Sequence, residues 1–129
     1  MKFEEASDIK ESIEGIVSAL GMERIDTKRL FCMRSRGSKG RSIARIWSMP
    51  KIWQKAMGIK AHYVIEVISE RFDRLSFEER EKTLIHELMH IPKGFSGGLV
   101  PHNCFGKRID HKSVDKLFRE YRERKLTHT

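Results

Sequence analysis

Two histidines four residues apart flank a glutamate in the segment HELMH, which runs from His86 to His90. On a helix, side chains four residues apart lie on the same face, so both imidazoles can reach a single ion. Neutral imidazole is a common ligand of zinc in proteins. Glu87 can lean toward the open coordination position and accept a proton there from a water that the metal activates. The spacing therefore predicts a Zn²⁺ site with His86 and His90 as ligands and Glu87 as the catalytic base.

A catalytic zinc site needs a third protein ligand and a position that is open to water. The metzincin spacing would place a histidine six residues after His90, but that position is Ser96. His102 is our first choice, because it ends the loop 92–101, whose glycines allow the chain to reverse. His111 is the alternative. Weaker candidates are Asp110, Glu120 and Cys104.

The helix that carries this motif has clear ends in the sequence. Ser76 and Glu79 form a capping box, in which the serine side chain binds a free amide and the glutamate reaches back. Pro92 disfavours helical geometry at the residue before it, so we expect the helix to end near Ile91. Ahead of the helix, the β-branched segment 62–69 predicts a half- to fully buried strand.

The rest of the chain predicts an α+β fold around this helix. Two short apolar runs, 30–36 and 42–47, surround the Gly-rich segment GSKG and indicate a β-hairpin. The stretch 51–57 lies between a proline and a glycine and predicts a short helix. We expect three of its side chains to pack inward: Ile52, Trp53 and Met57. The expected elements are an N-terminal helix over 3–20, a small mixed or antiparallel sheet of about three strands, the central helix of the motif and a C-terminal helix over about 110–125.

The composition limits the class of protein. The chain has 129 residues, 39% of them hydrophobic, which is too apolar for a disordered chain and suits one compact domain over residues 1–129. No apolar run approaches the roughly 18–20 residues of a membrane span, and the acidic N-terminus lacks the apolar region of a secretory signal. Two cysteines far apart fit a reducing compartment. We therefore expect a cytoplasmic protein with no membrane partner.

Positive charge is concentrated in the middle of the chain. The formal net charge is +8, and residues 24–60 hold eleven Lys and Arg against one acid. A basic patch attracts phosphate backbones, and nearby tryptophans can stack on bases. The alternative to a catalytic protein is therefore a basic nucleic-acid-binding module with a structural or vestigial metal site. The residues that it would use lie on the expected hairpin: Arg34, Arg36, Lys39 and Arg41.

The segments HELMHIP, KGFSGG and PH, preceded by HYVIEVISERFDRLS, resemble a small predicted metallopeptidase family of archaea and their viruses. The resemblance covers about residues 28–122 and extends, more distantly, to the SprT-like and minigluzincin zinc proteases. It implies a protein with a zincin-like fold that hydrolyses a peptide or protein substrate. In that reading His86, His90 and His102 are the zinc ligands and Glu87 is the base. Proteases recruited to DNA are known among SprT-like relatives, so a DNA-associated protease is also open.

The resemblance also raises the question of how the substrate is held. The strand 62–69 can bind an extended peptide as an added strand if it lies at an edge of the sheet. A second donor, besides the metal, would stabilise the oxyanion of the reaction. The candidates for this donor are His111, Arg108 and Tyr121.

Overall fold

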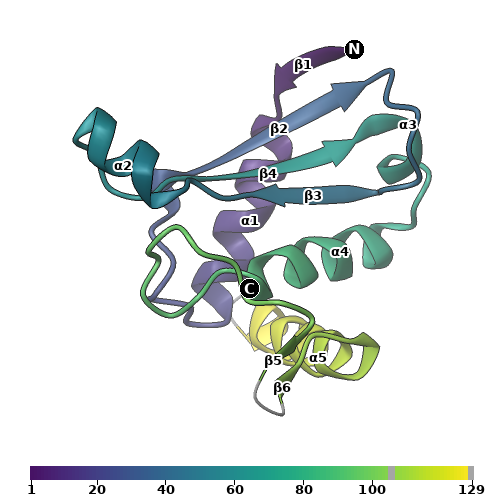
Figure 1. Ribbon diagram of the computed structural model, residues 1–129. Coiled ribbons are helices and arrows are strands. Elements are labelled where there is room, and N and C mark those ends of the chain that lie inside the picture. The colour runs from purple at the N-terminus through teal and green to yellow at the C-terminus, as the bar shows by residue number, and fades with distance from the viewer. Residues whose placement is uncertain (105–106, 128–129) are drawn as a thin grey trace.

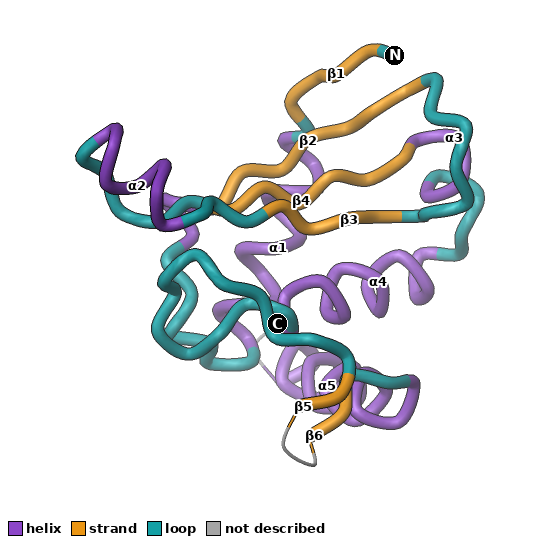
Figure 2. The backbone as a smooth tube through the Cα atoms, in the orientation of Figure 1, coloured by secondary structure: helices purple, strands orange, loops and turns teal. Residues whose placement is uncertain are grey.

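The computed structural model describes residues 1–104 and 107–127. Its elements are β1 (Lys2–Glu5), α1 (Ser7–Ala19), the 3₁₀ turn η1 (Thr27–Arg29), β2 (Leu30–Arg36), β3 (Ala44–Trp47), α2 (Lys51–Met57), β4 (Tyr63–Ile68), α3 (Ser69–Phe72), α4 (Phe77–Met89), β5 (Asn103–Cys104), β6 (Lys107–Arg108) and α5 (His111–Thr127). A four-stranded sheet packs on the long helices α1, α4 and α5, which lie on one side of it (Figure 1). The tube view shows the same layers, with the short β5–β6 pair preceding α5 in the chain (Figure 2). The α+β expectation is confirmed at this level.

The sheet is mixed, and its order contradicts the expected hairpin. The strand order is β1-β2-β4-β3, with β4 parallel to β2 and antiparallel to β3. Because β4 lies between β2 and β3, the prediction of a β2–β3 hairpin was wrong. The physical reason is burial, since β4 has five buried residues out of six and is protected best with a neighbour on both sides. β4 is therefore central, and β1 and β3 are the edges.

The sheet has four strands rather than about three because the N-terminus begins with a strand. Residues 3–5, which we assigned to a helix, belong to β1, and α1 begins only at Ser7. β1 pairs antiparallel with the end of β2, where Glu4 lies opposite Arg34. The Nε of Arg36 also donates to Glu4 Oε1 at 2.8 Å. These contacts join segments about thirty residues apart, so no short sequence pattern predicts them.

The same ion pairs change the expected nucleic-acid surface. Arg34 contacts Asp8 at 2.8 Å and Asp73 at 2.9 Å, and its side chain is only 16% exposed. Arg36 is paired with Glu4. Two of the four cations on the expected hairpin are thus paired with acids of the same chain, whereas Lys39 and Arg41 lie in the connection between β2 and β3. Nucleic-acid binding by these four residues stays a prediction.

The core lies between the sheet and the helices. Alternate residues of β2 and β4 point toward α1 and α4 and are buried there. None of the described helices is both long enough and apolar enough to span a bilayer. The core includes Ile9, Ile13 and Ile16 from α1, Leu30 and Cys32 from β2, Tyr63, Ile65 and Val67 from β4, Leu84, Ile85 and Leu88 from α4, and Val114 and Phe118 from α5.

Helix α2 has the expected bounds, but its side chains point the other way. Ile52, Trp53 and Met57 are exposed by 76%, 59% and 57%, so the expectation that they pack inward was wrong. The inward position is instead taken by Gln54, whose Nε2 donates to backbone carbonyls, including that of Ser96 at 3.0 Å. Helix α2 is therefore held to the body by a polar side chain and buries none of its residues.

Candidate metal centre

Helix α4 begins where the capping box predicts. The Oγ of Ser76 accepts a hydrogen bond from the backbone N–H of Glu79 at 3.2 Å. The helix then packs an apolar face into the core, which sets the direction of its last turns. His86 and His90 share one face there, with ring centroids 5.1 Å apart. The buried apolar positions are Leu84, Ile85 and Leu88.

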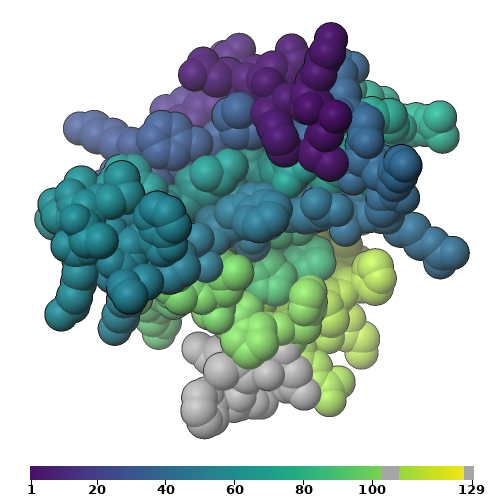
Figure 3. All heavy atoms as spheres, turned by 45° about the horizontal axis from the view of Figure 1, so that its top comes forward, coloured from purple at the N-terminus to yellow at the C-terminus, as the bar shows by residue number. Residues whose placement is uncertain are grey.

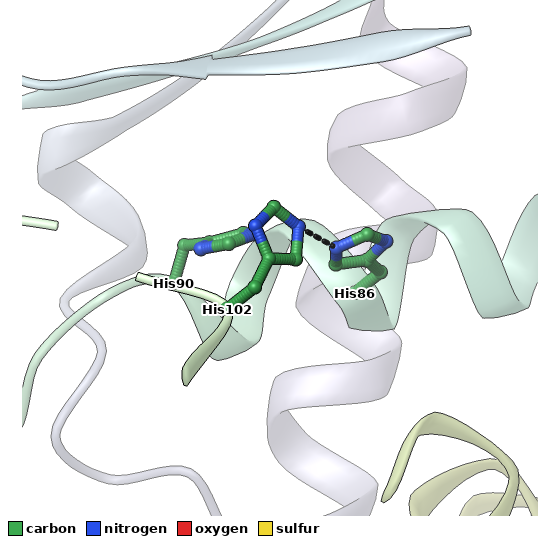
Figure 4. A group of neighbouring side chains, drawn as sticks. All are labelled: His86, His90 and His102. Atoms are coloured by element: carbon green, nitrogen blue, oxygen red, sulfur yellow. Dashed lines mark hydrogen bonds between the residues drawn. The ribbon is translucent and has the colours of Figure 1, made fainter. Parts of the chain in front are cut away.

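The loop after α4 folds back and brings His102 to these two histidines. The backbone N–H of Val100 donates to the carbonyl of His90 at 2.7 Å, which fixes the return of the chain. The Nε2 atoms of His86 and His102 lie 3.1 Å apart (Figure 4). One ligand atom from each of the three histidines lies within 4.8 Å of the others. The structure therefore gathers the three predicted ligands into one cluster that can hold a metal ion.

His90 has a hydrogen bond that suits it to metal binding. Its Nδ1 lies 2.6 Å from the carbonyl oxygen of Val100. A carbonyl can only accept, so Nδ1 carries the proton in this contact and Nε2 is left with its lone pair. Histidines that bind metals are commonly oriented by such a bond from the other ring nitrogen.

The surroundings of His86 and His90 favour the neutral form of these two imidazoles. Burial, and after it the neighbouring His90, His102 and His111, together lower the pKa of His86 to about 4. Burial likewise lowers the pKa of His90. Only a neutral imidazole has a free lone pair for a metal, so at neutral pH these side chains are in the form that binds.

Glu87 lies beside the cluster in a low-polarity environment. The residue is 8% exposed, and burial raises the pKa of its carboxyl group from 4.5 to about 7. A carboxyl group in this range can both accept and release a proton near neutral pH, as a general base requires.

Tyr63 holds the loop in place, a role that we did not predict from the sequence. The tyrosine lies on the central strand β4, and its hydroxyl donates to the carbonyl of Gly98 at 2.8 Å. The same hydroxyl accepts a hydrogen bond from the N–H of Gly97 at 2.9 Å. Its ring meets Phe95 edge-on, with centroids 4.8 Å apart. A tyrosine in a strand predicted to be half to fully buried was the available signal, because a buried hydroxyl needs a partner.

The other candidates fall into different places. His111 lies outside the three-histidine group, but it lines a cavity of about 320 Å³ together with His86 and His102. Asp110 is used as a cap of α5, where it accepts from the N–H of Ser113 at 3.0 Å. Tyr121 is 4% exposed and contacts Glu81, so it does not fit the role of an oxyanion donor. The side chain of Cys104 lies outside the described residues.

A second cavity, of about 650 Å³, is larger but lacks this chemistry. It lies along α1 and the first residues of β2, and its lining is mostly apolar. Cys32 borders it, and burial raises the pKa of that thiol to about 11, so the thiol stays protonated. Among the described residues, the three-histidine cluster is the one group suited to a metal.

The comparisons with known proteins agree with this chemistry. Residues 1–122 match a protein family described as "Putative phage metallopeptidase". Searches of curated proteins and of solved structures each found no match. The family match spans nearly the whole chain and includes the helix and the loop that supply the histidines. The chain therefore belongs to this family of phage metallopeptidases.

Proposed function

We propose that the chain is a zinc-dependent peptidase whose metal is held by His86, His90 and His102. The observation that carries the proposal is the convergence of these three imidazoles, with ligand atoms within 4.8 Å, next to a buried Glu87. Three imidazoles are a ligand set typical of catalytic zinc, because they leave one position for water or substrate. The exposure of His102 at the mouth of the cluster supports an accessible site.

The chain's own groups account for the proton transfers of peptide hydrolysis. Zinc bound at this site would polarise a water and a substrate carbonyl and lower the pKa of the water toward neutrality. Glu87 accepts the proton of the attacking water and passes it to the leaving amine nitrogen. Because burial keeps the carboxyl group of Glu87 poorly hydrated, its pKa is matched to both steps. His111, on the wall of the adjoining cavity, is the chain's best-placed second donor for the oxyanion.

An extended peptide substrate must pair with a strand other than the one over 62–69 that we considered from the sequence. Strand β4 is flanked on both sides, so its edge pairing with a peptide is excluded. Strand β3 ends the sheet on the side of α4 (Figure 1). Its outer edge has the unpaired backbone groups that an extended peptide can join. We propose this edge as the place where the substrate backbone binds.

The test separates metal binding from catalysis. Purified wild-type protein should hold about one zinc per chain, and His86→Ala with His90→Ala should abolish it. His62→Ala is the control, since His62 lies outside the cluster. Glu87→Gln should retain zinc and lose hydrolysis of a denatured protein, whereas Glu120→Gln on α5 should keep both. Zinc that survives the double histidine change, or equal activity in Glu87→Gln, would overturn the assignment.

A further inference from the structure

Helix α2 is an exposed apolar element that the proposed peptidase chemistry does not use. It projects from one end of the molecule, away from the other helices (Figure 3). With Gln54 facing inward, a helical wheel places Ile52 and Ala56 opposite it, and Trp53 and Met57 continue the same apolar arc along one flank of the helix. All four are exposed. Such a cluster of solvent-exposed apolar side chains usually marks a binding surface.

Positive charge borders this apolar face. Lys51 and Lys55 are one turn apart on its flank, and Lys60 follows just after the helix. None of the described ion pairs involves these lysines. The sequence from 27 to 65 contains no Asp or Glu, and the adjoining loop 92–101 contains none either. The surface therefore combines apolar contact with uncompensated positive charge.

We propose that α2 docks the protein onto an anionic lipid surface. A short amphipathic helix inserts its apolar side chains at the boundary of headgroups and acyl chains, and its lysines reach back to anionic headgroups. Ile52 and Met57 meet apolar atoms there, and Lys51 and Lys55 meet negative charge. The absence of a spanning segment in the sequence led us to expect no membrane partner, but docking at a lipid surface requires no such segment.

Two other partners fit the surface less well. Nucleic acid offers phosphates to the lysines and bases to Trp53, but it gives Ile52 and Met57 nothing to bury them. A symmetric contact between two copies would place Lys51 and Lys55 against the same lysines of the second copy. The combination of charge and apolar side chains therefore favours lipid. A single helix this short gives weak, reversible binding.

The two tryptophans of the chain make the test specific. The sequence contains only Trp47, at the end of β3, and Trp53, on α2. Full-length protein is mixed with vesicles of phosphatidylcholine alone or with added phosphatidylglycerol, and binding is measured by sedimentation and tryptophan emission. We expect binding and a blue shift only with phosphatidylglycerol, weakening as salt rises. In Trp47→Phe, the remaining Trp53 should still show the shift.

Paired variants separate the two contributions. Replacing Lys51 and Lys55 by serine should weaken binding roughly thirtyfold, at about 1 kcal/mol for each lysine. Ile52→Ser should weaken it about tenfold. Leu126→Ser is the matched control, because Leu126 on α5 is 76% exposed, as is Ile52, and it should bind as wild type.

Three outcomes would overturn the proposal. One is equal binding to vesicles with and without phosphatidylglycerol. Another is equal loss of binding in Ile52→Ser and Leu126→Ser. The third is that the protein does not bind vesicles but does bind a DNA oligonucleotide through the same lysines. That result would assign the surface to nucleic acid. Since α2 supplies none of the three histidines, each result stands whether or not the chain proves to be a zinc peptidase.

Discussion

Tyr63→Phe tests whether the attachment of the loop to β4 sets the affinity of the metal centre. The Tyr63 hydroxyl binds the carbonyl of Gly98 at 2.8 Å and the N–H of Gly97 at 2.9 Å. Phenylalanine keeps the ring and its edge contact with Phe95 but removes the oxygen. The buried N–H of Gly97 then loses its acceptor, five residues before His102.

The size of the effect follows from these two bonds. A buried amide without a partner costs about 1–3 kcal/mol, and a lost ordinary hydrogen bond costs about 1 kcal/mol. We take about 2 kcal/mol as the combined loss, which corresponds to a fall in Tm of about 6–8 °C for a chain of this length. If zinc binds only when the loop 92–101 is attached to β4, the same loss of about 2 kcal/mol limits the loss of zinc affinity to roughly thirtyfold. We therefore expect zinc binding to weaken by roughly three- to thirtyfold.

The assay compares the only two tyrosines of the chain. Zinc affinity is measured by competition with a chelating dye, and Tm by thermal melting without metal. Tyr121→Phe is the control, because Tyr121 is also buried but contacts Glu81 on α4 rather than the loop, and burial with that contact raises its pKa to about 12. The control should lower Tm and leave zinc affinity unchanged. Identical behaviour of the two variants would refute the role of Tyr63 in positioning the loop.

Three further predictions follow from single contacts. Burial raises the pKa of Glu87 to about 7, so the metal-free folded chain holds this proton more tightly than the unfolded chain and loses stability as pH rises from about 4.5 through 7. Urea unfolding at pH 5 and pH 8 should show that Glu87→Gln gains about 2–3 kcal/mol relative to wild type between these two pH values, and a constant difference would contradict the pKa shift. Gly97 has φ of +103°, and a Cβ there would collide with Gln54 and with a backbone carbonyl, so Gly97→Ala should lower Tm by about 5 °C or more and Gly98→Ala by less. Ser76→Ala removes the cap of α4 and should cost about 1 kcal/mol in urea unfolding, whereas Ser76→Asp, which can still cap, should cost little.

Local signals in the sequence were sufficient for the helix that carries the candidate ligands. The capping box predicted the start of α4 at Ser76, and the proline after it predicted the end within two residues. The spacing of His86 and His90 then placed both on one face. His102 was chosen because a glycine-rich loop can reverse, and the structure brings it to within 3.1 Å of His86. Each of these inferences depends on chain geometry over fewer than twenty residues.

The order of the sheet could not be predicted in the same way. The pairing of β2 with β4 joins segments more than thirty residues apart, and turn residues between β2 and β3 favoured the wrong neighbour. The prediction of which face of α2 turns inward failed for a related reason. Its apolar residues suggest burial, but a single polar contact from Gln54 decides which face turns inward. Periodicity reports which residues share a face and does not report what that face meets.

The misplaced hairpin has consequences for the candidate site itself. Had β2 and β3 paired directly, β4 would have been an edge strand, and the edge next to α4 would have been a different one. With β4 in the centre, its Tyr63 is buried and can hold Gly97 and Gly98 from within the core. The position of β4 between β2 and β3 also leaves β3 as the edge strand beside α4, where a peptide backbone can pair. The central position of one strand therefore accounts both for the anchor of the ligand-bearing loop and for the open edge next to it.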